Sequence, residues 1–142
     1  MTSTAQRWVE PWATTAFSLL EGASMPEELV AAAAEQGLDA IGVADRDSVY
    51  GLVRAWKAAR STPNLAVLHG ATLTVAATAG PPRELALYAM DEAGWGDLCE
   101  LLTRAHAETP KGEGLLRLGQ LLDRQNGLVA LAAVSYTHLT LP

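Results

Sequence analysis

The apolar run AIGVA at residues 40–44 is the feature that most constrains how this chain can fold. It does not alternate between apolar and polar residues, which is typical of a strand buried on both faces of a parallel sheet. Helical patterns precede and follow it. Because parallel strands are usually joined by crossover helices, this stretch predicts an α/β fold.

The rest of the chain continues this alternation of strands and helices. Ser24 is expected to cap the first helix, with Glu27 in the capping-box position, and Gly37 is expected to end it. The pattern predicts one domain with mainly parallel strands, either a doubly wound sheet or part of a barrel. The expected strands are 8–12, 40–44, 65–68, 72–75, 84–90 and 128–133, and the expected helices are 24–37, 49–60, 95–107 and 118–124.

Composition narrows the classes of function. The 142 residues have room for about one domain, and ten basic against sixteen acidic residues give a net charge of −6. No Lys/Arg cluster stands out, so the chain by itself is not expected to bind DNA. Cys99 is the single cysteine, which fits a reducing cytoplasm. With no signal peptide and no run of about 20 apolar residues, a cytoplasmic location without membrane contact is expected.

The last nine residues, VSYTHLTLP at 134–142, resemble the in-frame translation of a transposase adaptor used in sequencing libraries. On this interpretation they are a non-native tail, and the natural protein continues past Ala133. The expected organisation is a disordered N-terminus at 1–7, a truncated domain at 8–133 and the tail.

Four motifs in order carry a family resemblance: FSLLEGASMPEELV at 17–30, GLDAIGVADRDSVYG at 37–51, DEAGWGDLCELLTRAH at 91–106 and PKGEG at 110–114. Together they resemble the start of a bacterial DNA polymerase III alpha subunit of the error-prone, DnaE-type branch. That region is a PHP (polymerase and histidinol phosphatase) domain. The resemblance implies the N-terminal part of a distorted, here incomplete, β/α barrel.

The resemblance also locates a metal site whose ligands have changed. Family members with an intact site carry a His-x-His pair where this chain has Trp12 and Thr14. They carry Asp-His where it has Asp45-Arg46, and a glutamate where it has Thr72. Of these five family ligand positions, only Asp45 keeps a metal-binding side chain.

The replacements do not suit a metal ion. Indole offers only an N–H donor, guanidinium stays protonated, and threonine supplies a weak neutral oxygen. We therefore expect no catalytic residue, no bound metal and no cofactor in this segment. As a hypothesis, Arg46 replaces the metal as an internal counter-ion for Asp45 and Asp47.

The remaining candidate residues have structural interpretations. His69 and His106 have no acidic or thiol neighbour at ligand spacing, and Cys99 lies beside Leu98 on an amphipathic helix. The tryptophans are interpreted as core or interdomain packing residues: Trp8, Trp12, Trp56 and Trp95.

The expected function is that of a catalytically silent scaffold within an error-prone DNA polymerase. The parent would add nucleotides with Mg²⁺ in DNA replication and translesion repair synthesis, and the scaffold would contact DNA only through the parent's polymerase body. Two alternatives stay open. A stand-alone degenerate PHP binding module would be favoured by a native stop codon near residue 133. A working PHP phosphoesterase or exonuclease would require stoichiometric Zn or Mn.

Overall fold

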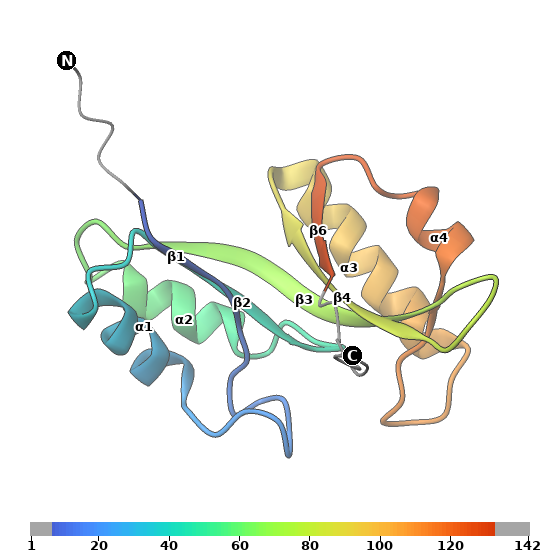
Figure 1. Ribbon diagram of the computed structural model, residues 1–142, viewed down its shortest axis with the longest axis horizontal. Helices are drawn as coiled ribbons and strands as arrows, with labels where there is room; N and C mark the ends of the chain where they lie inside the picture. Colours follow the sequence, from blue (N-terminus) through green and yellow to red (C-terminus); the bar gives the residue numbers. More distant parts are fainter. Residues whose placement is uncertain (1–6, 133–142) are drawn as a thin grey trace, which may run out of the picture.

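A computed structural model describes residues 7–132. They form one curled sheet of parallel and antiparallel strands, with helices packed against it (Figure 1). The expected tail at 134–142 and residues 1–6 lie outside this range. The elements follow the order β1 (Val9–Ala13), α1 (Pro26–Glu35), β2 (Ala40–Arg46), α2 (Leu52–Ala59), β3 (Ala66–Ala76), β4 (Arg83–Ala89), α3 (Glu92–Ala107), β5 (Leu116–Arg117), α4 (Leu118–Leu122) and β6 (Leu128–Ala132).

The sheet has the order β1-β2-β3-β4-β6, with β5 paired to the end of β3. β1, β2 and β3 are parallel, as expected, and Asp45 of β2 lies opposite Ala71 of β3. The expectation of mainly parallel strands is wrong for the second half. β4 runs antiparallel to β3, and β6 runs antiparallel to β4, because a hairpin replaces the crossover helix after β3.

β3 corrects a second expectation. The segments 65–68 and 72–75 are not two strands but parts of one eleven-residue strand that continues through His69 and Gly70. The first half of β3 pairs with β2 and its second half pairs with β4. Gly70 lies where the two pairings overlap, so its backbone is paired with both neighbouring strands. Figure 1 shows β3 running through both halves of the molecule.

The first helix is capped differently from the expectation. Met25, not Ser24, is the N-cap residue, and Glu28, not Glu27, accepts a hydrogen bond from the Met25 backbone N–H at 2.8 Å. The predicted stop at Gly37 is confirmed. Gly37 adopts a φ of 71°, and its N–H and that of Leu38 bond back to the last helical turn, which caps its carbonyls.

Other boundaries shift by a few residues. Helix α2 begins at Leu52 instead of 49, α3 begins at Glu92 instead of 95, and α4 ends at Leu122 instead of 124. Asp91 caps α3 by accepting from the Gly94 N–H at 2.7 Å. Strand β1 extends through Pro11 to Ala13, with an irregular register beside the proline.

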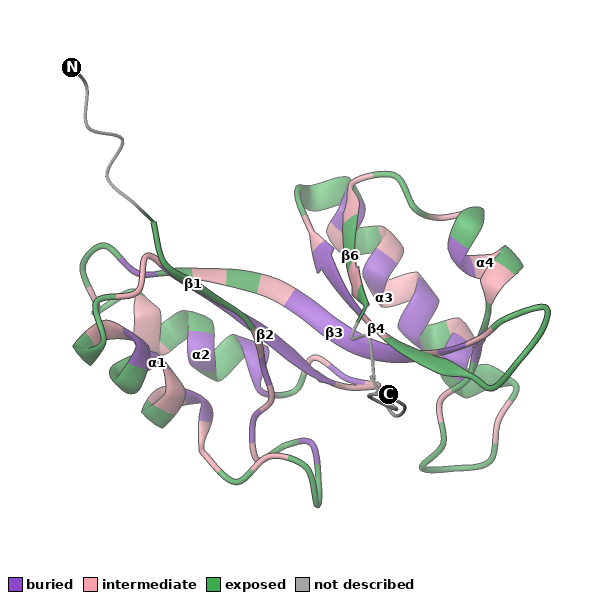
Figure 2. Cartoon of the chain, viewed as in Figure 1, coloured by how far each residue is buried: buried purple, intermediate pink, exposed green. Residues whose placement is uncertain are grey.

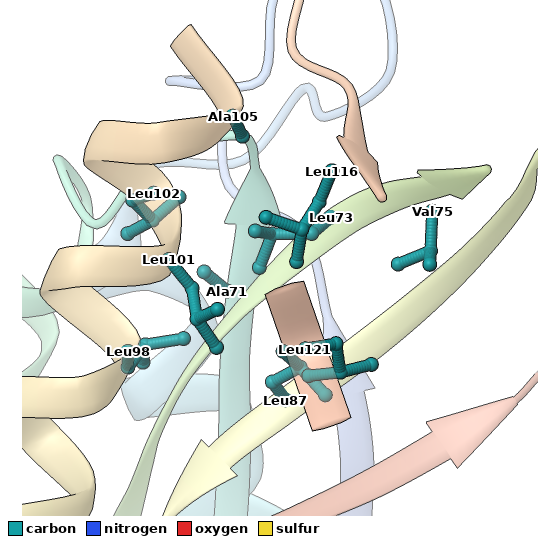
Figure 3. Close-up of a cluster of buried hydrophobic side chains, with 10 residues drawn as sticks. All are labelled: Ala71, Leu73, Val75, Leu87, Leu98, Leu101, Leu102, Ala105, Leu116 and Leu121. Carbon is teal, nitrogen blue, oxygen red and sulfur yellow. The ribbon is translucent and has the colours of Figure 1, made fainter. Parts of the chain in front are cut away.

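Two apolar clusters lie between the helices and one face of the sheet, as the burial pattern in Figure 2 shows. Residues alternate in a strand, so Val43 of β2 and Leu73 of β3 point to the helices. The first cluster joins β3, β4 and α3 (Figure 3): Ala71, Leu73, Val75, Leu87, Leu98, Leu101, Leu102, Ala105, Leu116 and Leu121. The second joins β1, β2, α1 and α2: Ala13, Val30, Ala33, Ile41, Val43, Leu52, Ala55 and Leu65.

The opposite, helix-free face carries a smaller cluster around Tyr88, formed with Ala44, Ala86 and the partly buried Trp12. The Tyr88 ring lies over the backbone of Gly70, where a β-carbon would overlap it. Its hydroxyl donates a hydrogen bond to the carbonyl oxygen of Pro11. Burial raises the pKa of this phenol, which therefore stays protonated and able to donate.

Candidate functional site: a replaced metal centre

Four of the five positions that the resemblance assigns to metal ligands lie at the carboxyl ends of β1 and β2, where α/β folds place their functional groups. The fifth, Thr72, lies within β3, opposite the last residue of β2. Asp45 and Arg46 are consecutive in β2, so their side chains point to opposite faces of the sheet. Asp45 points toward the helices, and Arg46 points to the helix-free face. Thr72, which lies opposite Arg46 in the register, shares that face.

Asp45 is buried, with 1% of its surface exposed, and its carboxylate accepts hydrogen bonds from the surrounding loops. Its Oδ1 accepts hydrogen bonds from the backbone N–H of Thr15 at 2.8 Å and from the hydroxyl of Ser18 at 2.9 Å. Its Oδ2 accepts from the backbone N–H of Gly51 at 3.2 Å. A β-carbon at Gly51 would overlap this carboxylate, so glycine permits the close approach.

Through these contacts Asp45 joins two loops, the one after β1 and the one before α2. The Thr15 hydroxyl also lies within 2.8 Å of Oδ2, and Ser18 Oγ accepts from the Arg46 N–H at 2.8 Å while it donates to Asp45. The carboxylate is thus stabilised by hydroxyl and amide donors. The one family position that keeps a metal-binding side chain is therefore committed to holding the loops together.

Trp12 and Thr72, at two of the positions that the resemblance assigns to metal ligands, bond to each other. The Trp12 indole Nε1–H donates to Thr72 Oγ1 at 2.9 Å, and that hydroxyl donates to the Ala44 carbonyl oxygen at 2.9 Å. Thr72 is buried, with 6% exposed. A chain of hydrogen bonds therefore crosses from β1 to β3 where the family would bind metal.

Arg46 forms ion pairs with Glu21, in the loop after β1, and with Glu84, on β4. The sequence-based hypothesis named Asp45 and Asp47 as the partners of Arg46. The ion pairs found for Arg46 within residues 7–132 are instead with the two glutamates. Asp45 lies on the other face of the sheet. Because all three side chains are partly exposed, this network contributes modestly to stability.

Asp47 follows directly in the loop after β2, with a φ of 48°. Burial raises the pKa of this carboxyl, and the charges of His106 and Arg46 oppose the rise. Its backbone oxygen lies 2.8 Å from His106 Nε2, and its carboxylate packs against Gly114, where a β-carbon would overlap it. Arg46 thus acts on Asp47 only as a nearby charge.

Thr14 has no side-chain hydrogen bond within residues 7–132. In the same described range, no three His, Cys, Asp or Glu side chains come together to hold a metal ion. The residues at these strand ends do not fit the family's metal cluster, because an indole N–H and a paired guanidinium replace its electron-pair donors.

The remaining candidates are structural in their contacts. His69 packs edge-to-face on Trp95, with ring centroids 6.2 Å apart, and burial lowers its pKa. Burial raises the pKa of the Cys99 thiol, which disfavours the reactive thiolate. Sequence reasoning missed Thr15, Ser18 and Gly51 as partners of Asp45. The available signal for Ser18 and Gly51 was their place in the motifs at 17–30 and 37–51, and Thr15 lies outside all four motifs.

The mixed α/β fold with a curled half-barrel sheet is the fold class of PHP and amidohydrolase-like structures. The PHP domain family model matches residues 13–142, and the chain belongs to this family. A solved protein of Bifidobacterium adolescentis, described as a metal-dependent phosphoesterase, superposes with a TM-score of 0.58 at 22% identity, covering 71% of this chain and 34% of that one. An amidohydrolase from Chromobacterium violaceum superposes with a TM-score of 0.56 at 22% identity, covering 68% and 32%. At this identity the likeness shows the fold alone.

Curated relatives are more similar in sequence. An error-prone DNA polymerase of Anaeromyxobacter sp. (strain K) is 43% identical over 134 residues, which cover 94% of this chain and 11% of the relative. An error-prone DNA polymerase of Mesorhizobium japonicum is 49% identical over 109 residues, covering 75% and 9%. The chain therefore spans about a tenth of the length of these relatives. No helix among residues 7–132 is both long and apolar enough to span a membrane.

Proposed function

We propose that this PHP domain is the N-terminal scaffold of an error-prone DNA polymerase and has no metal-dependent hydrolase activity of its own. The parent, of the polymerase III alpha type, would add nucleotides to a primer with Mg²⁺ in replication and translesion repair synthesis. Its Mg²⁺ ligands would lie outside this chain, in the polymerase body. Contact with DNA would also be made by that body, in the cytoplasm.

The observation that carries the proposal is the bonding of the replaced ligands. Trp12 and Thr72 satisfy each other, Arg46 is paired with glutamates, and Asp45 is held by four polar groups from the loops. Each former ligand position with a bonded side chain thus has a structural role that a metal would disrupt. This bonding supports a scaffold in which these side chains stabilise the fold and do not bind a metal ion.

The proposal is tested on the natural full-length polypeptide and on this chain in parallel. We expect the full-length protein to extend a primed template with Mg²⁺, and this chain to leave phosphate monoesters and single-stranded DNA uncleaved with Zn²⁺ or Mn²⁺. A full-length protein without primer extension would contradict the polymerase assignment. Metal-dependent cleavage by this chain, abolished by Asp45→Asn, would contradict the silent scaffold.

The length of the open reading frame distinguishes the polymerase scaffold from a stand-alone binding module. Genomic sequence that continues in frame for the length of the relatives supports the polymerase parent. A native stop codon near residue 133 would instead favour a free binding module.

A further inference from the structure

An apolar groove lies on the helix-covered face of the sheet, between α2 and α3. Elsewhere on this face, α1 and α2 pack against each other, but no comparable packing joins α2 to α3. The reason is the topology: β3 passes into β4 through a hairpin, so no crossover helix follows β3. Figure 1 shows α2 and α3 on either side of the stretch of β3 that is left between them.

The groove consists of two adjoining cavities that share Trp56 and His69. The first has a volume of about 410 Å³ and is lined by Leu52, Val53, Trp56, His69 and Trp95. The second has a volume of about 330 Å³ and is lined by Trp56, Ala59, Arg60, Leu65, Ala66, Val67 and His69. Trp95 packs against both core clusters and forms part of the wall.

The α2 wall exposes large apolar side chains to solvent. Val53 is 67% exposed and Trp56 is 45% exposed. Contiguous exposed apolar surface of this kind marks an interaction site more often than isolated exposed residues do. A tryptophan at the centre of such a groove is typical of the residues that contribute most to binding.

Charge identifies the kind of partner. Helix α2 carries Arg54 and Lys57, with Arg60 as its C-cap residue, and it has no acidic residue, although the chain as a whole has a net charge of −6. Arg54 is paired with Glu27 of α1. Arg60 stacks over the Trp56 ring at 5.0 Å, and no salt bridge is found for it within residues 7–132. This leaves a cation at the edge of the apolar groove that an acidic side chain would complement.

The length of the relatives identifies the source of the partner. This chain corresponds to 11% of the Anaeromyxobacter polymerase, so a parent of that size has most of its polypeptide outside residues 7–132. We propose that the groove binds an amphipathic helix from that part of the parent polypeptide. Its apolar face fills the space beside Trp56, and an acidic residue pairs with Arg60. The helix occupies the position that the hairpin after β3 leaves empty.

This inference rests on the proposed function, because the partner helix comes from the proposed parent. Its test measures the accessibility of the groove and not polymerase activity. Val53→Cys is introduced into the full-length polypeptide, with Ala31→Cys as the matched control, because Ala31 is an exposed residue of α1 away from the groove. The rate at which a maleimide labels each cysteine is read by mass spectrometry of its peptide. Primer extension by the same preparations tests the proposed function separately.

We expect the cysteine at position 53 to react with maleimide at least about tenfold more slowly than the cysteine at position 31. The bound helix must detach from the groove before the reagent can reach the thiol. Arg60→Glu is expected to raise the rate at position 53 at least about threefold by like-charge repulsion, whereas Arg60→Lys leaves it low.

Equal rates at the two positions would overturn the proposal. A rate at position 53 that rises on dilution would also overturn it, because the occupant would then be a second copy of the protein. Unchanged labelling in Arg60→Glu would rule out the acidic partner. Loss of primer extension with protection intact would contradict the polymerase assignment and leave the groove occupied.

Discussion

Asp45, near the end of β2, and Asp47, in the loop after it, are two residues apart, yet their carboxylates have different hydrogen-bond partners. Asp45 is surrounded by donors from Thr15, Ser18 and Gly51, so its carboxylate is well accommodated in the interior. Asp47 has one oxygen, Oδ1, that is buried without a hydrogen-bond partner within residues 7–132. Burial therefore disfavours the charged form of Asp47 and raises its pKa.

Asp47→Asn is expected to raise the melting temperature at pH 7. The pKa of Asp47 is raised from 3.8 in the folded state, so above pH 3.8 the unfolded state loses this proton first and the folded state is disfavoured as pH rises. Asparagine cannot ionise and tolerates the positive φ. Because Asp47 is partly exposed, the gain is about 1 kcal/mol or less.

Thermal unfolding between pH 3 and pH 8 measures this difference. The advantage of Asp47→Asn is expected to disappear below pH 3.8, where aspartate is protonated in both states. Asp123→Asn, at an exposed carboxylate, is the control and is expected to leave the melting temperature unchanged. A lower melting temperature for Asp47→Asn at pH 7 would show that the charged carboxylate stabilises the fold through Arg46 or His106.

At the scale of elements, helix α3 is positioned by close backbone contact. Its N-terminal turn lies against the backbone of Gly127, the residue before β6, and Met90 donates a backbone hydrogen bond to the Gly127 carbonyl oxygen at 2.9 Å. A β-carbon at Gly94 would overlap that carbonyl group, with Gly127 C at 2.7 Å. At Gly96, two residues further along α3, an added β-carbon would have no neighbouring atom within 4 Å.

These two glycines predict opposite effects of the same substitution. Gly94→Ala is expected to destabilise the fold by about 1–3 kcal/mol, because the methyl group pushes α3 away from the strand that follows. Gly96→Ala is expected to stabilise it by about 0.4–1 kcal/mol, because alanine favours the helix and restricts the unfolded chain. Urea unfolding measures both, and a loss of stability in the two variants alike would show that the contact with Gly127 does not decide the outcome.

At the scale of the whole molecule, side chains on the helix-free face of the curled sheet bond across its strands. Trp12 joins β1 to β3, Arg46 joins β2 to β4, and Tyr88 joins β4 to β1. These three side chains lie on the helix-free face and cross between strands.

Metal ions are accordingly expected not to stabilise the molecule. A ligand at 100 times its Kd stabilises the folded state by about 2.7 kcal/mol, so a site with micromolar affinity would raise the melting temperature measurably in excess Zn²⁺ or Mn²⁺. We expect no rise for the natural sequence. The variant Trp12→His, Arg46→His, Thr72→Glu places metal-binding side chains at three positions and serves as the comparison. A rise in melting temperature for the natural sequence would contradict the expectation.

The sequence by itself determined the α/β class and the parallel strands β1 to β3, and it fixed the chemistry of the side chains at the proposed ligand positions. These depend on local properties: the burial of AIGVA, the stop at Gly37 and the chemistry of each side chain. Only the tertiary structure decided that β3 is one strand, that β4 reverses direction and that Arg46 pairs with Glu21 and Glu84. The physical reason is that strand direction and ion-pair partners depend on which segments lie side by side, and Glu84 is 38 residues away from Arg46 in the chain.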